Sequence, residues 1–106
     1  MEVGPQRPEV EGPLDAEIVQ RVVRQHRREV QQCYEAQLSQ EPDLSGRIEL
    51  EWTISEEGDV TDVEVAESTM NSDEVEECLT SRVEQWSFPE PDGGEVEVAY
   101  PFEFDA

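Results

Sequence analysis

Two cysteines are the residues of this chain whose positions suggest a covalent link. Cys33 and Cys78 each fall on the apolar side of a segment with helical periodicity, so both thiols should point inward. If both helices cover the same face of a sheet, the thiols can form a disulfide that encloses 44 intervening residues. Such a bridge would stabilise the domain by roughly 3–4 kcal/mol. Two separate buried thiols are the alternative, because free cysteines are common in cores and pairing needs an oxidising compartment.

The other reactive side chains form no pattern typical of an enzyme or a metal site. His26 lies among arginines, a setting more typical of a solvated side chain than of a catalyst. The serines lack a nucleophile motif, no CxxC pair is present, and the glycines are too scattered for a phosphate-binding loop. A hydrolase built on carboxylates is disfavoured, because a flat three-stranded sheet offers little room for a cleft. We therefore predict a non-enzymatic protein with no catalytic residue, metal or cofactor.

Acidic residues set the electrostatic character of the chain. There are 28 acids, seven arginines and no lysine, and the net charge is −2 over residues 1–40 and −19 over residues 41–106. This field repels nucleic acid and anionic membrane surfaces, and its main expected role is solubility, although it also favours a basic partner. The acid runs 56–59 and 73–77 lack EF-hand spacing, so a solvated acidic surface is preferred over loose calcium binding.

A single basic patch is expected on the first helix, where Arg21, Arg24 and Arg28 recur at helical spacing. The preferred interpretation is that these arginines pair with acids of the same domain. The alternative is a secondary site for an anionic partner.

The elements that would hold these residues fit one domain of 106 residues. Residues 1–13 contain three prolines and read as the remnant of a linker, and residues 14–106 form the domain. Helical periodicity covers residues 14–40 and 71–86, the second helix capped by Asn71 or Ser72. Alternation predicts strands at 47–54 and 60–67, joined by a turn at Gly58, with a bulge at Val60. The predicted fold is α+β in the order α-β-β-α-β: a three-stranded antiparallel sheet covered on one face by two helices.

The last segment, residues 95–104, alternates most clearly. Val96, Val98, Tyr100, Phe102 and Phe104 form one face, and Glu95, Glu97, Pro101 and Glu103 are expected to face water. Pro101 has no N–H to donate to a ladder, so the strand is predicted at a sheet edge. An exposed edge can dock a strand from another protein. The glutamates on the water-facing side would favour a strand with positive charge.

Several short motifs together resemble a known family. They are Leu14 to His26, Cys33-Tyr-Glu35, Glu57-Gly-Asp-Val-Thr61, Val75-Glu-Glu-Cys78, Trp86-Ser-Phe-Pro89 and Tyr100-Pro-Phe102. In this order they resemble a TonB-like C-terminal domain, specifically the AgmX/PglI type of myxobacterial gliding-motility proteins. The resemblance covers nearly all of residues 14–104.

The resemblance implies a periplasmic interaction domain of an envelope-spanning protein, tethered to the inner membrane by an anchor outside this sequence. It implies a disulfide between Cys33 and Cys78, since the periplasm permits oxidation. It also implies a protein or peptide partner in the outer membrane or envelope, docked by strand addition along Val96, Val98, Tyr100, Pro101 and Phe102. The alternative is a structural module that forms a homodimer through this edge, within a gliding-motility or envelope transport complex. No apolar run approaches the roughly 20 residues that span a bilayer, so no direct membrane insertion is expected.

Overall fold

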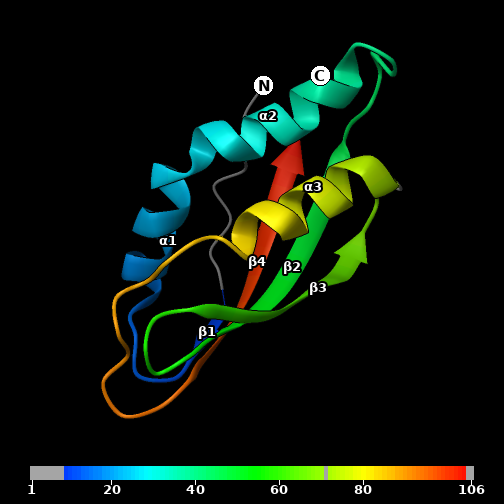
Figure 1. The fold of residues 1–106 in the computed structure, drawn as a ribbon. Coiled ribbons are helices and arrows are strands. Elements are labelled where there is room, and N and C mark those ends of the chain that lie inside the picture. Colours follow the sequence, from blue (N-terminus) through cyan, green and yellow to red (C-terminus); the bar gives the residue numbers. More distant parts are fainter. Residues whose placement is uncertain (1–8, 71, 105–106) are drawn as a thin grey trace.

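An antiparallel sheet of four strands carries the helices on one face (Figure 1). The computed structural model describes residues 9–70 and 72–104. Their elements are β1 (Glu9–Glu11), α1 (Ala16–Gln25), α2 (Arg27–Leu38), β2 (Gly46–Ile54), β3 (Val60–Ser68), α3 (Asp73–Val83) and β4 (Val96–Phe104). The predicted α+β class and one-sided covering of the sheet are confirmed. The predicted order is corrected by an additional first strand and by a division of the first helix.

The strand order β1-β4-β2-β3 places β4 inside the sheet. β4 pairs with β2 over its whole length, from Val96 opposite Ile54 to Phe104 opposite Gly46. Its outer side pairs with β1 at residues 97–99, so the prediction of an edge strand was wrong over these residues. β1 lies in the segment predicted as a linker, where a run of three residues is too short to be distinguished by alternation. Residues 1–8 of that segment lie outside the described residues, and a domain boundary near Leu14 stays a prediction.

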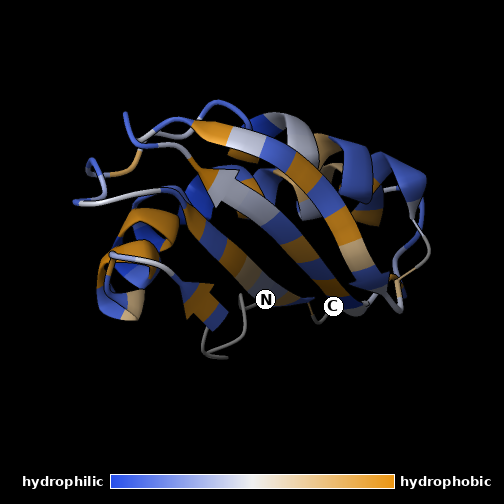
Figure 2. Ribbon diagram, turned by 90° about the horizontal axis from the view of Figure 1, so that it is seen from below, coloured by the Kyte–Doolittle hydropathy of each residue, from blue (hydrophilic) through white to orange (hydrophobic). Residues whose placement is uncertain are grey.

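Alternation along the two central strands builds one apolar face. Ile48, Leu50, Trp52 and Ile54 of β2 lie opposite Phe102, Tyr100, Val98 and Val96 of β4, and all are buried. Figure 2 shows this alternation of hydrophobic and hydrophilic residues along the strands. The helices cover the apolar face, and Val19, Val30 and Leu79 from α1, α2 and α3 are fully buried in the same core. Every second strand residue is therefore left on the uncovered face.

The predicted continuous helix over residues 14–40 is broken at His26. The backbone of His26 leaves helical geometry (φ −102°, ψ 13°), and its N–H donates to the carbonyl of Val23 at 3.0 Å, a tighter turn than in an α-helix. The His26 ring stacks on Trp86, with ring centroids 4.6 Å apart. α1 and α2 each bury apolar residues on their own side of the break, among them Val19 in α1 and Val30 in α2. Periodicity did not reveal the break, because the apolar spacing continues across it.

The second predicted helix is confirmed as α3, with Ser72 as its N-cap. The Ser72 hydroxyl oxygen accepts a hydrogen bond from the Val75 N–H at 3.3 Å. Asn71, the rival cap, lies outside the described residues. Acids in the first turn of α3 add a favourable interaction with the helix dipole.

The predicted disulfide between Cys33 and Cys78 is confirmed and joins α2 to α3. The sulfurs are 2.04 Å apart and the Cα atoms 5.6 Å apart. α2 and α3 lie next to each other over the sheet (Figure 1), so the bridge holds the two covering helices together.

We expect the double substitution Cys33→Ala/Cys78→Ala to lower the free energy of unfolding by about 3–4 kcal/mol, because the unfolded chain gains loop entropy. Urea unfolding followed by tryptophan fluorescence measures this change. A reducing agent should lower the wild-type midpoint and leave the double variant unaffected. A wild-type midpoint that does not respond to complete reduction would contradict a stabilising bridge.

The turn between β2 and β3 is fixed to the segment after α3. The N–H of Gly58 donates to Ser55, and the carbonyl of Gly58 accepts from the Phe88 N–H at 2.9 Å. Gly58 has a φ of +89°, and a Cβ there would lie 2.2 Å from the Phe88 carbonyl oxygen. The hairpin turn therefore requires glycine. The prediction of a bulge at Val60 was wrong, because Val60 pairs with Ile54. The register shifts lie further along β3, where Asp62 has a φ of +52°.

We expect Gly58→Ala to destabilise the fold by about 1–3 kcal/mol, through positive-φ strain and the contact with the Phe88 carbonyl. Thermal or urea unfolding checks the effect. Gly93→Ala is a suitable control, because it also has a positive φ but a Cβ there meets nothing within 4 Å. Equal losses in the two variants would show that the contact with Phe88 carries no cost.

Candidate functional site

The apolar residues predicted to line the docking strand are part of the core. Val96, Val98, Tyr100 and Phe102 all point to the helix-covered face and are buried. Burial raises the pKa of the Tyr100 phenol above its ordinary value, opposed by the nearby charge of Arg24. A strand added to β4 would therefore meet the backbone and the uncovered face of β4 and not these four side chains.

Pro101 lies on the uncovered face opposite Glu49, and it is buried, whereas the alternation predicted that it faces water. A residue in an antiparallel strand directs its N–H and C=O to the same side. Because β2 pairs with β4 on one side throughout, the missing N–H of Pro101 must fall on the outer side. Glu97 and Ala99 share that orientation, so they offer complete donor and acceptor groups to the outer edge, and Pro101 offers only an acceptor.

β1 occupies the part of the edge that keeps its donors. Glu9 lies opposite Ala99, Val10 opposite Val98 and Glu11 opposite Glu97. Val10 is partly buried and packs against the core, while Glu9 and Glu11 are exposed on the uncovered face. We name this stretch of β4, Glu97 to Ala99, the β1 seat. Among the described residues, β4 beyond the seat pairs only with β2.

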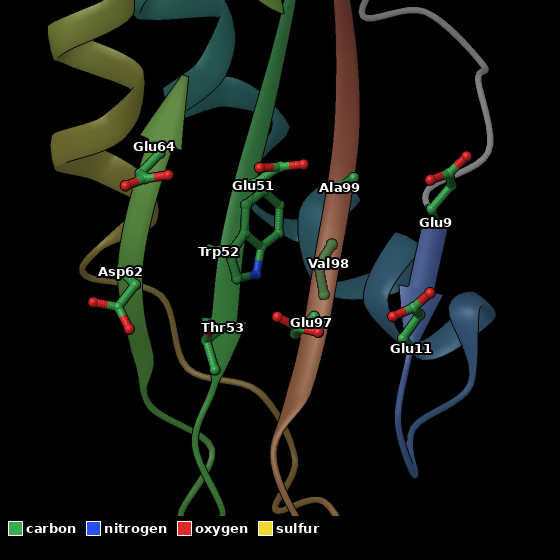
Figure 3. Close-up of a pocket in the computed structure, with 10 residues that line it drawn as sticks. All are labelled: Glu9, Glu11, Glu51, Trp52, Thr53, Asp62, Glu64, Glu97, Val98 and Ala99. Carbon is green, nitrogen blue, oxygen red and sulfur yellow. The ribbon is translucent and has the colours of Figure 1, made fainter. Parts of the chain in front are cut away.

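The uncovered face beside the seat is hollowed and acidic. A shallow hollow of about 460 Å³ crosses the four strands, and Figure 3 shows the residues that line it. Six are carboxylates, distributed over all four strands: Glu9, Glu11, Glu51, Asp62, Glu64 and Glu97. No basic residue of the described chain lines it. Arg47, elsewhere on this face, pairs with Glu49 at 3.0 Å. The hollow is thus suited to basic side chains.

The other edge of the sheet is β3, and its geometry makes it a poor template for strand addition. Its register against β2 shifts twice, and Asp62 adopts a positive φ within it. Irregularities of this kind twist an edge away from a flat ladder. Its exposed Val65 lies in a smaller hollow shared with Glu76 and Glu77 of α3.

The predicted basic patch is divided between two helices. Arg21 and Arg24 lie on α1 and Arg28 on α2, on either side of the break at His26, and all three are exposed. The ion pairs found among the described residues are His26–Glu29 and Arg47–Glu49. The expected pairing of the three arginines with acids of the domain is thus not seen there, and a secondary anionic site stays a prediction.

His26, Glu29 and Trp86 form a small cluster at the helix break. Nδ1 of His26 lies 2.7 Å from Oε2 of Glu29, and the indole N–H of Trp86 donates to the other Glu29 oxygen at 3.4 Å. The hydrogen bond from His26 holds the pKa of the Glu29 carboxyl below its usual 4.5, with the Trp86 bond and the charges of His26 and Arg82 acting in the same direction against burial. The cluster joins the start of α2 to the segment after α3, a structural role.

We expect Glu29→Gln to remove a stabilising contribution that depends on pH. A carboxylate with a lowered folded-state pKa stabilises the fold above its unfolded pKa and loses this effect as pH falls through the folded pKa. The wild type should therefore be more stable than the variant at about pH 6, and the gap should close toward pH 3. Urea midpoints across this range measure the gap. The control is Glu35→Gln, an exposed residue on the same helix. A gap independent of pH would contradict the cluster.

The described residues contain no group of three or more His, Cys, Asp or Glu side chains placed to hold a metal ion. None of the described helices is long and apolar enough to cross a bilayer.

Sequence reasoning missed β1 and the acids of β2 and β3 that line the hollow. The pattern of β1 is present, since Glu9-Val10-Glu11 alternates between polar and apolar, but it spans only three residues. Glu51, Asp62 and Glu64 come together with Glu97 only because the registers of three strands align them. Alternation assigns each to a face of its own strand and cannot place the strands side by side.

Comparisons with known proteins agree with this architecture. The sequence profile of the family described as the Gram-negative bacterial TonB protein C-terminal matches residues 36–106. The solution structure of the TonB C-terminal domain from Helicobacter pylori has a similar fold, with a TM-score of 0.53. The two chains share 19% sequence identity, and the match covers 88% of this chain and 84% of that one. No curated protein matches the chain significantly.

Proposed function

Because this chain belongs to the family of Gram-negative bacterial TonB C-terminal domains, we propose that it docks a protein of the cell envelope by strand addition to the outer edge of β4. Domains of this family are periplasmic and mediate protein interactions in the envelope without enzymatic activity. To these family properties the proposal adds how the partner docks, by strand addition, and where it docks, at the outer edge of β4. It further holds that the domain is tethered to the inner membrane and belongs to the AgmX/PglI type of gliding-motility or transport proteins.

The observation that carries this proposal is the β1 seat. An antiparallel strand already pairs there, so the backbone of Glu97 and Ala99 has the geometry and the donors that an added strand needs. Backbone pairing supplies affinity at such an edge, and alternate side chains supply selection. The apolar side chains of β4 are buried in the core, and β4 pairs with β2 over its whole length.

We expect a synthetic peptide of alternating lysine and valine to shift the backbone amide resonances of residues 97–104 in a titration followed by NMR. Ala99→Pro should abolish binding, because it removes an outer donor while the ladder to β2 is kept. Ala66→Pro on β3 is the matched control and should bind normally. Shifts confined to α1 or β3, with residues 97–104 untouched, would overturn the proposal.

The alternative function is an assembly module that pairs two copies through the same edge. The molecular mass in solution distinguishes it, because a stable dimer would occupy the edge of β4 without any peptide. A dimer that Ala99→Pro converts to a monomer would favour this alternative over docking of a partner strand.

A further inference from the structure

We propose that β1 is a displaceable strand, and that the partner replaces it on the β1 seat with a basic–apolar–basic segment antiparallel to β4. In such a segment, arginine or lysine takes the positions of Glu9 and Glu11, and an apolar residue takes the position of Val10. This inference rests on the proposed function and goes further, because it names the residues that a partner must displace and the chemistry that it must carry.

The seat is the part of the edge that a partner strand needs. Beyond it, Pro101 interrupts the row of outer donors, so a ladder formed only on the residues after Ala99 begins at a position without an N–H. Upstream of Pro101, Glu97 and Ala99 keep both groups, and β1 pairs with them. A strand that pairs with β4 beyond the residues after Ala99 must use Glu97 and Ala99, and it must therefore compete with β1.

β1 makes few favourable interactions with β4 compared with an ordinary strand. It has three residues, fewer than the usual five or six. Glu11 lies directly opposite Glu97, and like charges at opposed positions are destabilising. Glu9 lies opposite Ala99, and Glu51 is the next residue across the sheet in the same row. Only Val10, partly buried against the core, gives β1 an apolar contact.

A partner with basic residues reverses the sign of these interactions. Side chains at the positions of Glu9 and Glu11 enter the acidic hollow, as Figure 3 shows for the two glutamates. Lysine or arginine there would meet Glu97, Glu51 and Glu64, whose charges no basic residue of the described hollow offsets. The middle residue points to the opposite face, beside Val98, and must be apolar. The register with β4 therefore sets which partner residues face the hollow and which face the core. The carboxylates of the hollow require the residues that face it to be basic.

Gly12 controls whether β1 can take the seat. It has a φ of +130°, and a Cβ at this position would lie 2.7 Å from the Glu95 carbonyl oxygen and 3.0 Å from Val96 Cα. Its carbonyl accepts from the Leu14 N–H at 2.9 Å, which turns the chain from β1 toward α1. Replacing Gly12 therefore opposes the pairing of β1, because the added Cβ would meet Glu95 and the first residue of β4, Val96. These contacts lie outside the β1 seat, so the substitution leaves the backbone of Glu97 to Ala99 unchanged in sequence.

The test measures how the full chain binds the peptide Lys-Val-Lys-Val-Lys when β1 is weakened or strengthened. Gly12→Ala and Val10→Asn weaken β1 by independent routes, and each should tighten binding by about two- to tenfold, because the open seat becomes more populated. The double variant Glu9→Lys/Glu11→Lys gives β1 favourable charges and should weaken binding by about two- to tenfold. Its control is Glu56→Lys/Glu57→Lys, which makes the same charge change in the exposed turn before Gly58. Higher salt should shrink the preference for basic peptide.

The outcomes separate this inference from the function on which it rests. If the peptide shifts residues 97–104 but all β1 variants bind like their controls, strand addition holds and displacement of β1 is wrong. If Glu-Val-Glu-Val-Glu binds as tightly as the lysine peptide, selection by the acidic hollow is wrong. If the lysine peptide leaves β4 unaffected even in Gly12→Ala and Val10→Asn, strand addition at β4 itself fails.

Discussion

The antiparallel pairing of β2 with β4 is the constraint from which the rest of this structure follows. It runs unshifted from Gly46 opposite Phe104 to Ile54 opposite Val96. Each of the buried β2 residues Ile48, Leu50, Trp52 and Ile54 therefore lies beside a buried apolar residue of β4. If one of the two strands slipped by one residue, its whole apolar row would turn from the core to the uncovered face. The same register fixes the uncovered face, where Glu51 lies opposite Ala99 and Thr53 opposite Glu97. Core and acidic hollow are thus two faces of one pairing.

Because the helices lie on one face of the sheet, the opposite face is left uncovered. Helices α1, α2 and α3 pack on the apolar face, and the Cys33–Cys78 bridge holds α2 and α3 together there. A small domain with one covered face gains most of its stability from a single core and a covalent link. The acids on the uncovered face therefore take no part in the core. Six of them line the acidic hollow, and their charge favours basic side chains there, which links the charge of the chain to the proposed docking.

The fold could be predicted from the sequence wherever a pattern was long enough. Strands β2, β3 and β4 each run for nine residues, and alternation located all three. β1 escaped because three residues carry too little periodicity, and the break at His26 escaped because both helices keep the same stripe across it. These missed elements affected the prediction of the candidate site more than the prediction of the fold. Pro101 correctly indicated an outer edge without a donor, but the strand that occupies that edge just before it, at residues 97–99, was hidden in a segment that reads as a linker.

The sequence by itself determined the two-faced strands, the inward-pointing cysteines, the acidic character and the family resemblance, because each depends on spacing along a single segment. Only the tertiary structure decided which strand lies beside β4, that Glu11 opposes Glu97, and that carboxylates from four strands share one hollow. These are relations between segments far apart in the chain. They are set by the register of the ladders and the direction in which the chain turns at Gly12, which no local periodicity encodes.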